Sequence, residues 1–175
     1  PSDLCCEGFV SVGVALVLAL VTAAPVADGE TVRLCGRDWP VTADAVTCEG
    51  SPYSTTLTDG RLPAALTRFT SLRSLTLKRL TVRDCSVLAR LGGLKELVLS
   101  HTTVDAAVCL GAATTIERLS LRKTRLKGLD QLQSLTALRE LVMPVEVTDL
   151  SPLAGIKSLA SLDLSGTKAT DLSPL

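Results

Sequence analysis

LRSLTL at residues 72–77 returns as LKELVL at 94–99, IERLSL at 116–121, LRELVM at 138–143 and LASLDL at 159–164. Successive copies start 22 residues apart, except that the fourth and fifth start 21 apart. After each copy, another apolar residue usually comes five positions on, and more follow at steps of three. Residues 72–175 are therefore built from one short unit used five times, with the last copy incomplete.

The spacing within the unit predicts a stacked solenoid. In L-x-x-L-x-L the last two leucines alternate with a residue of the opposite face, as in a strand, and the later three-residue steps suit a 3₁₀-like return. One unit cannot bury its own leucines, but stacked units bury a continuous column. We therefore expect an α/β repeat solenoid, a superhelix with a concave parallel β-sheet and short 3₁₀ or irregular convex returns.

A fixed period of this length with this spacing is the signature of a leucine-rich repeat. The units resemble the short 22-residue class, which occurs in the nuclear regulatory subunit of protein phosphatase 1 and in bacterial internalins. The sequence DLSPL at 149–153 and 171–175 also resembles the repeat tails of protozoan leucine-rich repeat proteins. The resemblance implies a binding scaffold and no particular activity, because members have unrelated partners.

Members of this class commonly carry Asn at a ladder position after the strand, where the amide bonds to the backbone of neighbouring turns. This sequence contains no Asn, and the ladder position holds Leu80, Thr102, Thr124 and Thr167. A threonine hydroxyl offers fewer hydrogen-bonding groups than an amide. We therefore expect a weaker ladder.

Composition limits the choice of partner. The chain of 175 residues is 46% hydrophobic but only 2% aromatic, so its core must be aliphatic. Its formal net charge is zero. Nucleic-acid binding needs a concentrated basic surface, so no nucleic-acid partner is expected.

Residues 9–27 are almost wholly apolar and end near Ala23-Ala24-Pro25. This pattern resembles a secretory signal peptide cleaved after Ala23, although residues 1–8 lack the usual Lys or Arg. The alternatives are an uncleaved membrane anchor and a buried segment of a soluble domain. We expect residues 1–27 to be a signal peptide or anchor, and the protein to be secreted or on the cell surface.

Residues 28–71 are expected to form an N-terminal cap with a degenerate first repeat, ahead of five repeats over 72–175. A solenoid needs a cap over its first core face, and exported repeat proteins often use one tied by a disulfide. Cys35 and Cys48 are expected to form this disulfide, and two free thiols are the alternative. A zinc site is not expected, because it needs more ligands than two cysteines. Cys85 falls at an inward position and is expected to be a buried thiol, with a disulfide to Cys109 as the alternative.

No catalytic or cofactor-binding motif is present. The sequence has no glycine-rich phosphate loop, nucleophile motif or cysteine pair at metal spacing, and its single histidine, His101, lies beside the ladder. We therefore expect a protein that is not an enzyme and that has no metal, cofactor or small-molecule substrate.

Strand positions that alternate with the buried leucines should face outward on the concave side. The candidate partner-binding residues are Lys78, Glu96, Val98, Ser100, Arg118, Ser120, Arg122, Glu140, Val142 and Asp163. Glu96 and Glu140 are expected beside Arg118. Arg122 has uncharged lateral neighbours, so an acidic partner would meet it there.

Two local features have more than one interpretation. The 21-residue unit is missing a residue between Met143 and Val147, which is either a tolerated deletion or a notch for a ligand. Ser151 and Ser173 each precede a proline and are expected to cap a short helical turn; exposed modification sites are the alternative.

Three functions fit these observations. The first is an exported or membrane-tethered recognition domain that binds a protein or glycan on its concave face. The second is a recognition segment of a larger enzyme, such as a cyclase, kinase or ubiquitin ligase. The third is a structural surface protein without a defined ligand.

Overall fold

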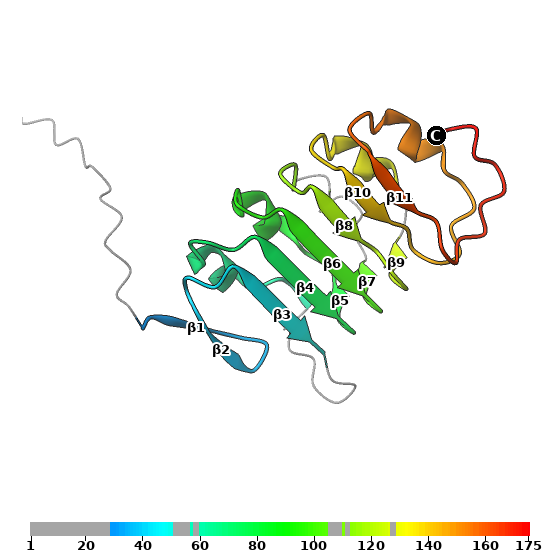
Figure 1. Ribbon diagram of the computed structural model, residues 1–175. Coiled ribbons are helices and arrows are strands. Elements are labelled where there is room, and N and C mark those ends of the chain that lie inside the picture. The colour runs from blue at the N-terminus through cyan, green and yellow to red at the C-terminus, as the bar shows by residue number, and fades with distance from the viewer. Residues whose placement is uncertain (1–28, 51–56, 58–59, 105–109, 111–112, 127–128) are drawn as a thin grey trace, which may run out of the picture.

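The computed structural model describes residues 29–50, 57, 60–104, 110, 113–126 and 129–175. The coils follow one another in sequence order along one direction (Figure 1). Within these ranges no helix is long and apolar enough to cross a membrane. The apolar segment 9–27 lies outside the described residues, so the prediction of a signal peptide or anchor stays a prediction.

Six parallel strands form the main sheet. They are β3 (Ala45–Glu49), β4 (Ser74–Lys78), β6 (Glu96–Ser100), β8 (Arg118–Ser120), β10 (Glu140–Val142) and β11 (Ser161–Asp163). They pair in chain order, each with the strand of the next coil, so β3 and β11 are the edges of the sheet. The register aligns equivalent positions, so Leu97 lies between Leu75 and Leu119. The predicted α/β repeat solenoid is confirmed.

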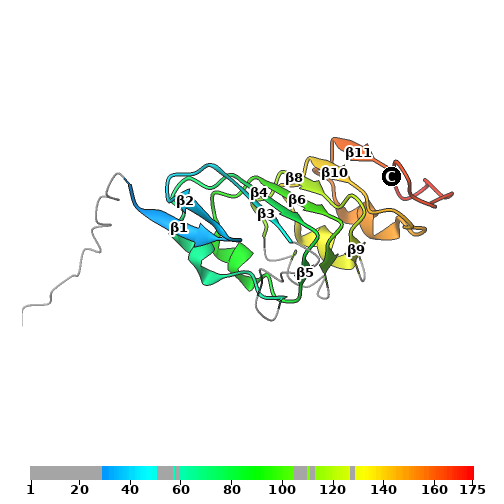
Figure 2. The ribbon, with the colours of Figure 1, turned by 90° about the horizontal axis from the view of Figure 1, so that it is seen from below.

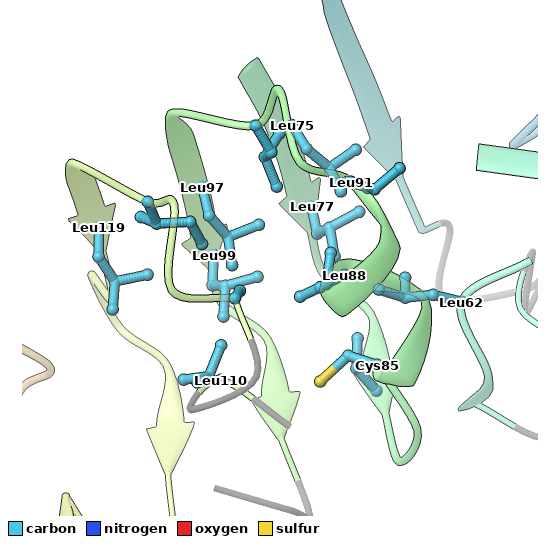
Figure 3. Packing of buried hydrophobic residues seen from close by; sticks show 14 of the residues in the cluster. Leu62, Leu75, Leu77, Cys85, Leu88, Leu91, Leu97, Leu99, Leu110 and Leu119 are labelled. Carbon is cyan, nitrogen blue, oxygen red and sulfur yellow. The ribbon is translucent and has the colours of Figure 1, made fainter. Parts of the chain in front are cut away.

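Alternation within the strands builds the core. In β6, Leu97 and Leu99 are buried while Glu96 and Val98 are partly exposed. The inward leucines of β4, β6 and β8 gather in the space that Leu88 also enters from the return side (Figure 3). The core is therefore one aliphatic column that runs through the coils, as the sequence predicts.

Short 3₁₀ helices cover the side of the stack opposite the main sheet (Figure 2). They are η2 (Ala64–Arg68), η3 (Ser86–Arg90), η5 (Asp130–Ser134) and η6 (Ser151–Gly155). Between strand and return, three two-residue strands form a second parallel sheet. These are β5 (Thr81–Val82), β7 (Thr103–Val104) and β9 (Arg125–Leu126).

The N-terminal part closes the first coil. β1 (Thr31–Leu34) and β2 (Arg37–Pro40) form an antiparallel hairpin, whose turn residues Cys35 and Gly36 both have positive φ. This is the geometry of a tight type I′ turn, which matches the twist of the flanking strands. Cys35 is bonded to Cys48 of β3, as expected, with a Cα–Cα distance of 5.3 Å. The disulfide therefore ties the hairpin to the first strand of the main sheet.

The predictions for Cys85 and for Ser151 are wrong. Cys85 is buried but disulfide-bonded rather than a free thiol, and its partner is not among the described residues. Ser151 does not cap η6; it is the first residue of that helix, and its backbone N–H donates to Asp149 Oδ1 at 2.8 Å. Asp171 accepts the N–H of Ser173 in the same way at 2.9 Å. The aspartate of DLSPL thus binds the N–H of the serine two residues later, in an Asx turn.

Candidate functional site: the concave face and an adjoining groove

The outward positions of the main sheet form lateral rows because the strands are in register. The central row contains Thr76, Val98, Ser120, Val142 and Asp163. All five residues are partly exposed. The two valines are thus held on the outer surface of the sheet, with a small serine between them.

A row of charged residues flanks the central row on one side. Glu96, Arg118 and Glu140 are lateral neighbours on β6, β8 and β10. Arg118 Nε lies 3.2 Å from Glu140 Oε1. Of the two carboxylates expected beside Arg118, Glu140 forms the ion pair, and Glu96 forms none within the described residues. Both partners are exposed, so the pair shapes the surface more than it stabilises the fold.

The expectation that Arg122 is left without a counter-ion is wrong. Its Nη2 lies 3.6 Å from Asp163 Oδ2, two coils away. The uncharged neighbours Ser100 and Pro144 do not prevent this, because the long arginine side chain reaches past the intervening coil. The pKa of Asp163 is lowered, mainly by hydrogen bonds from Ser165 and also by Arg122. Arg122 therefore has a counter-ion within the protein, in an ion pair that is exposed to solvent.

The remaining predicted residues, Lys78 and Ser100, are the last residues of β4 and β6 and are paired laterally. All ten predicted residues thus belong to the outer side of the main sheet or its immediate continuation. Across the described ranges, no three His, Cys, Asp or Glu side chains gather in a way that could hold a metal ion.

The ladder threonines link the coils at the ends of these strands. Thr102 and Thr124 are 1% and 2% exposed. Their hydroxyls donate to the carbonyls of Leu77 and Leu99 in the preceding coil, at 3.1 Å and 2.9 Å. Thr167 instead donates within its own turn, to Leu164 O at 2.8 Å. Two of the threonines therefore join neighbouring coils.

The residue before each ladder position turns the chain out of the strand. Arg79, His101, Lys123 and Gly166 have φ values of 53°, 53°, 55° and 85°. Only Gly adopts this left-handed conformation without strain. His101 is exposed and forms one of these turns, which explains its position without any catalytic role.

The fourth coil departs from this pattern. The missing residue was expected between Met143 and Val147, but the coil is short after Val147. Its left-handed residue is Glu146 and its ladder-equivalent residue is Val147, so the turn is one residue longer than elsewhere. Thr124 precedes Leu129 of its return by five residues, whereas Val147 precedes Leu150 by only three. The residues missing from this coil are those that form β5, β7 and β9 in earlier coils.

A groove of about 860 Å³ opens at this point. We call it the flank groove. One wall comes from the third coil and includes Lys123, Thr124, Arg125 and Leu126; the other comes from the fourth coil and includes residues 144–149. Its volume falls within the roughly 300–1,000 Å³ of ligand-binding sites. A notch was one of the two interpretations of this short unit, and the groove gives it a counterpart on the flank of the stack, lined by residues 144–149.

Comparison with known proteins gives matches among solved structures. No protein-family model matches the chain, and no curated protein matches it. An internalin of Listeria monocytogenes (inlF) is 27% identical with a TM-score of 0.53, over 64% of this chain and 40% of that one. Internalin C2 of the same organism is 26% identical with a TM-score of 0.53, over 64% of this chain and 50% of that one. A leucine-rich repeat protein of Leptospira interrogans is 18% identical, with a TM-score of 0.47, over 63% of this chain and 36% of that one.

The aligned repeats, the parallel sheet and the likeness to the two internalins define the class. This chain is a leucine-rich repeat protein. It spans 40% and 50% of the lengths of the two internalins that it matches.

Proposed function

We propose that this chain is a non-catalytic recognition domain that binds a protein partner on the concave face of its main sheet. The observation that carries the proposal is the outward placement of Val98 and Val142 in one row, with Ser120 between them. An apolar strand residue on the outer face adds nothing to the buried column. Its burial becomes favourable only when a partner covers it.

The surroundings of the valines fit such an interface. Specific interfaces have a centre depleted in charge and a polar rim. Here Glu96, Arg118 and Glu140 lie along one side of the central row, and the Arg122–Asp163 pair lies on the other side and at its end. Because the charged pairs are already neutralised, we expect the apolar centre to provide most of the affinity and the rim to select the partner.

The proposal includes a location outside the cytosol. Disulfides persist mainly in oxidising compartments, and both Cys35 and Cys85 are disulfide-bonded. The apolar sequence at 9–27 is the segment that would direct export. The proposed organisation is a signal peptide or anchor at 1–27, a disulfide-tied cap at 28–71 and repeats from 72 to 175.

Capture experiments with matched variants test the binding face. The immobilised chain would be exposed to extract of its native cells, and bound proteins quantified for wild type, Val98→Arg/Val142→Arg and a control, Ala89→Arg/Ala154→Arg. Ala89 and Ala154 are exposed in η3 and η6, so the control adds the same charge on the convex side. We expect a specific partner to be lost at least tenfold from the valine variant alone, with all three proteins melting alike. Equal capture by both variants would place the interface elsewhere.

A further inference from the structure

The last strand of the main sheet, β11, leaves the core of the fifth coil incompletely covered. It pairs with β10 on one side, and no described strand pairs with its other side (Figure 1). The three apolar residues of its unit are partly exposed: Leu159, Leu162 and Leu164. Their counterparts in the fourth coil are at most 1% exposed: Leu138, Leu141 and Met143. The open side of β11 is thus an apolar surface beside an unpaired strand edge.

The return of the fifth coil widens this surface. Leu172 and Leu175 are 55% and 57% exposed, whereas the equivalent Leu150 and Leu153 of the fourth coil are buried. A hollow of about 410 Å³ lies on this side, and Lys157 is the one charged residue that lines it. Clustered exposed apolar residues are typical of interaction sites. We call this surface the β11 face, and it is formed by Leu159, Leu162, Leu164, Leu172 and Leu175.

The central residue of β11 directs its backbone groups to the open side. The N–H of Ser161 donates to Arg139 O on the β10 side, at 2.9 Å. The carbonyl of Asp163 accepts from Met143 N on the same side, also at 2.9 Å. Alternate residues of a strand bond to opposite neighbours. Leu162, which lies between these two residues, therefore presents both its N–H and its carbonyl to the open side.

Two further backbone groups face the open side. The carbonyl of Arg139 accepts the N–H of Ala160 in the next coil, so the carbonyl of Ala160, at the same position one coil later, points to the open side. The N–H of Met143 donates to the next coil, at Asp163, so the equivalent N–H of Leu164 also points there. The open edge therefore offers two donors and two acceptors.

We propose that β11 pairs with β11 of a second copy of this chain, antiparallel and about a two-fold axis at Leu162. In this register, Leu162 exchanges both of its bonds with Leu162 of the copy, and Leu164 N–H donates to Ala160 O of the copy. Every open group of the edge is then paired. The Leu162 side chains meet on the inner side, and Ser161 lies opposite Asp163 on the outer side, so no like charges oppose each other.

Position 160 favours a second copy over a further parallel coil. In the four earlier coils the equivalent residue is charged: Arg73, Lys95, Glu117 and Arg139. Parallel stacking tolerates these charges because equivalent residues lie side by side, as in the Lys95–Glu117 ion pair at 2.8 Å. In the antiparallel register this position lies against Leu164, where a charge would lose its hydration. The fifth coil carries the small, uncharged Ala160 there.

The contact is expected to stop at a dimer. The opposite end of the stack is closed by the hairpin of β1 and β2, which is tied to β3 by the disulfide. Only the β11 face is therefore open, and a surface that pairs with itself about a two-fold axis closes. The concave faces of both copies stay exposed, so the inference goes beyond the proposed function.

Analytical ultracentrifugation of the full chain tests this contact. The proteins are wild type, Ala160→Arg, Leu172→Glu/Leu175→Glu and the control Ala89→Arg, which adds a charge at an exposed position of η3. Ala160→Arg should fold normally, because the fourth coil carries Arg139 at the same position. Melting curves establish that each variant is folded.

We expect wild type and Ala89→Arg to reach twice the 18.3 kDa of one chain and to form nothing larger. The dissociation constant of the dimer should rise at least tenfold, about 1.4 kcal/mol, in Ala160→Arg and in Leu172→Glu/Leu175→Glu. Val98→Arg/Val142→Arg, on the concave face, should dimerise like wild type.

Amide hydrogen exchange at low and high protein concentration locates the contact. The N–H groups of Leu162 and Leu164 should exchange more slowly in the dimer, and Ser161 N–H, which is already bonded, is the internal reference. The proposal is overturned if wild type stays monomeric up to about 1 mM or if Ala160→Arg dimerises normally. It is also overturned if the valine variant loses the dimer, or if Leu162 and Leu164 exchange alike at both concentrations.

Discussion

The hydroxyl of Thr124 donates a 2.9 Å hydrogen bond to the backbone carbonyl of Leu99, one coil earlier. Thr102 makes the equivalent bond to Leu77. Both threonines are buried, so each bond satisfies a carbonyl that water cannot reach. The chain therefore achieves with a hydroxyl one of the coil-to-coil links for which its class commonly uses an Asn amide.

Thr124→Val should lower the free energy of unfolding by about 1–3 kcal/mol, because the near-isosteric side chain leaves the buried Leu99 carbonyl unsatisfied. Thr124→Ser keeps the hydroxyl and should lose less. Thr167→Val should also lose less, since that threonine is only partly buried and bonds within its own turn. Urea denaturation of the three variants measures the differences. Equal losses of unfolding free energy at positions 124 and 167 would show that the hydrogen bond between coils stabilises the protein no more than a bond within one turn.

Leu121→Ala and Ser120→Ala test the orientation of the strand. Leu121 is 0% exposed, so truncation would leave a cavity and lower the free energy of unfolding by about 2–5 kcal/mol. Ser120 is on the outer face, and its change should stay within about 0.5 kcal/mol. Thermal or urea melts of the pair decide the matter. A loss at Ser120 as large as that at Leu121 would mean that the two faces are assigned the wrong way round.

Loss of the disulfide between Cys35 and Cys48 should destabilise the protein by roughly 3 kcal/mol in the chain-entropy model, because the bond closes a loop with a sequence separation of 13. The double variant Cys35→Ser/Cys48→Ser is preferable to chemical reduction, since Cys85 is also disulfide-bonded. Its unfolding should be compared with wild type under oxidising conditions. An unchanged midpoint would show that the cap folds equally well without the covalent tie.

Acid should weaken the Asx turn at the start of η6. The pKa of Asp149 is lowered, chiefly by hydrogen bonds from Ser151. A carboxylate with a lowered folded-state pKa stabilises the fold at pH values above the unfolded Asp pKa of about 3.9 and loses this effect as the pH falls through the folded value. Asp149→Ala should therefore melt below wild type at about pH 6. The difference in melting temperature should narrow as the pH falls through the lowered folded-state pKa of Asp149, because the wild-type carboxylate then takes up a proton. A difference that stays constant down to strongly acidic pH would contradict this role of the charge.

Much of the fold could be predicted because the repeat specifies it residue by residue. The position of Leu97 relative to Leu75 and Leu119 follows from the period, and the outward placement of Val98 follows from alternation. The disulfide partners Cys35 and Cys48 could be predicted from the need for a cap. These features depend on local spacing and on burial, both of which can be read from sequence.

The parts that could not be predicted depend on side-chain reach and on where a turn absorbs a length change. Arg122 forms an ion pair with Asp163 past one intervening coil. A prediction that considers only the lateral neighbours of Arg122 does not include this pair. The shortage in the fourth coil falls after Val147 because Glu146 takes the left-handed position, so the groove opens beside β9. One signal was available, since Val147 and Leu150 are too close together for a strand like β9 between them.

Carboxylate footprinting of the bound chain tests whether the concave face is the recognition surface. The chain would be labelled with a carbodiimide and an amine, free and in complex with the partner isolated by capture, and the labelled residues quantified by mass spectrometry. Glu96 and Glu140 flank Val98 and Val142, whereas Asp171 lies beyond β11 in the turn of the last coil. We expect strong protection of Glu96 and Glu140 in the complex and none of Asp171. Unchanged labelling of Glu96 and Glu140 in a saturated complex would contradict it.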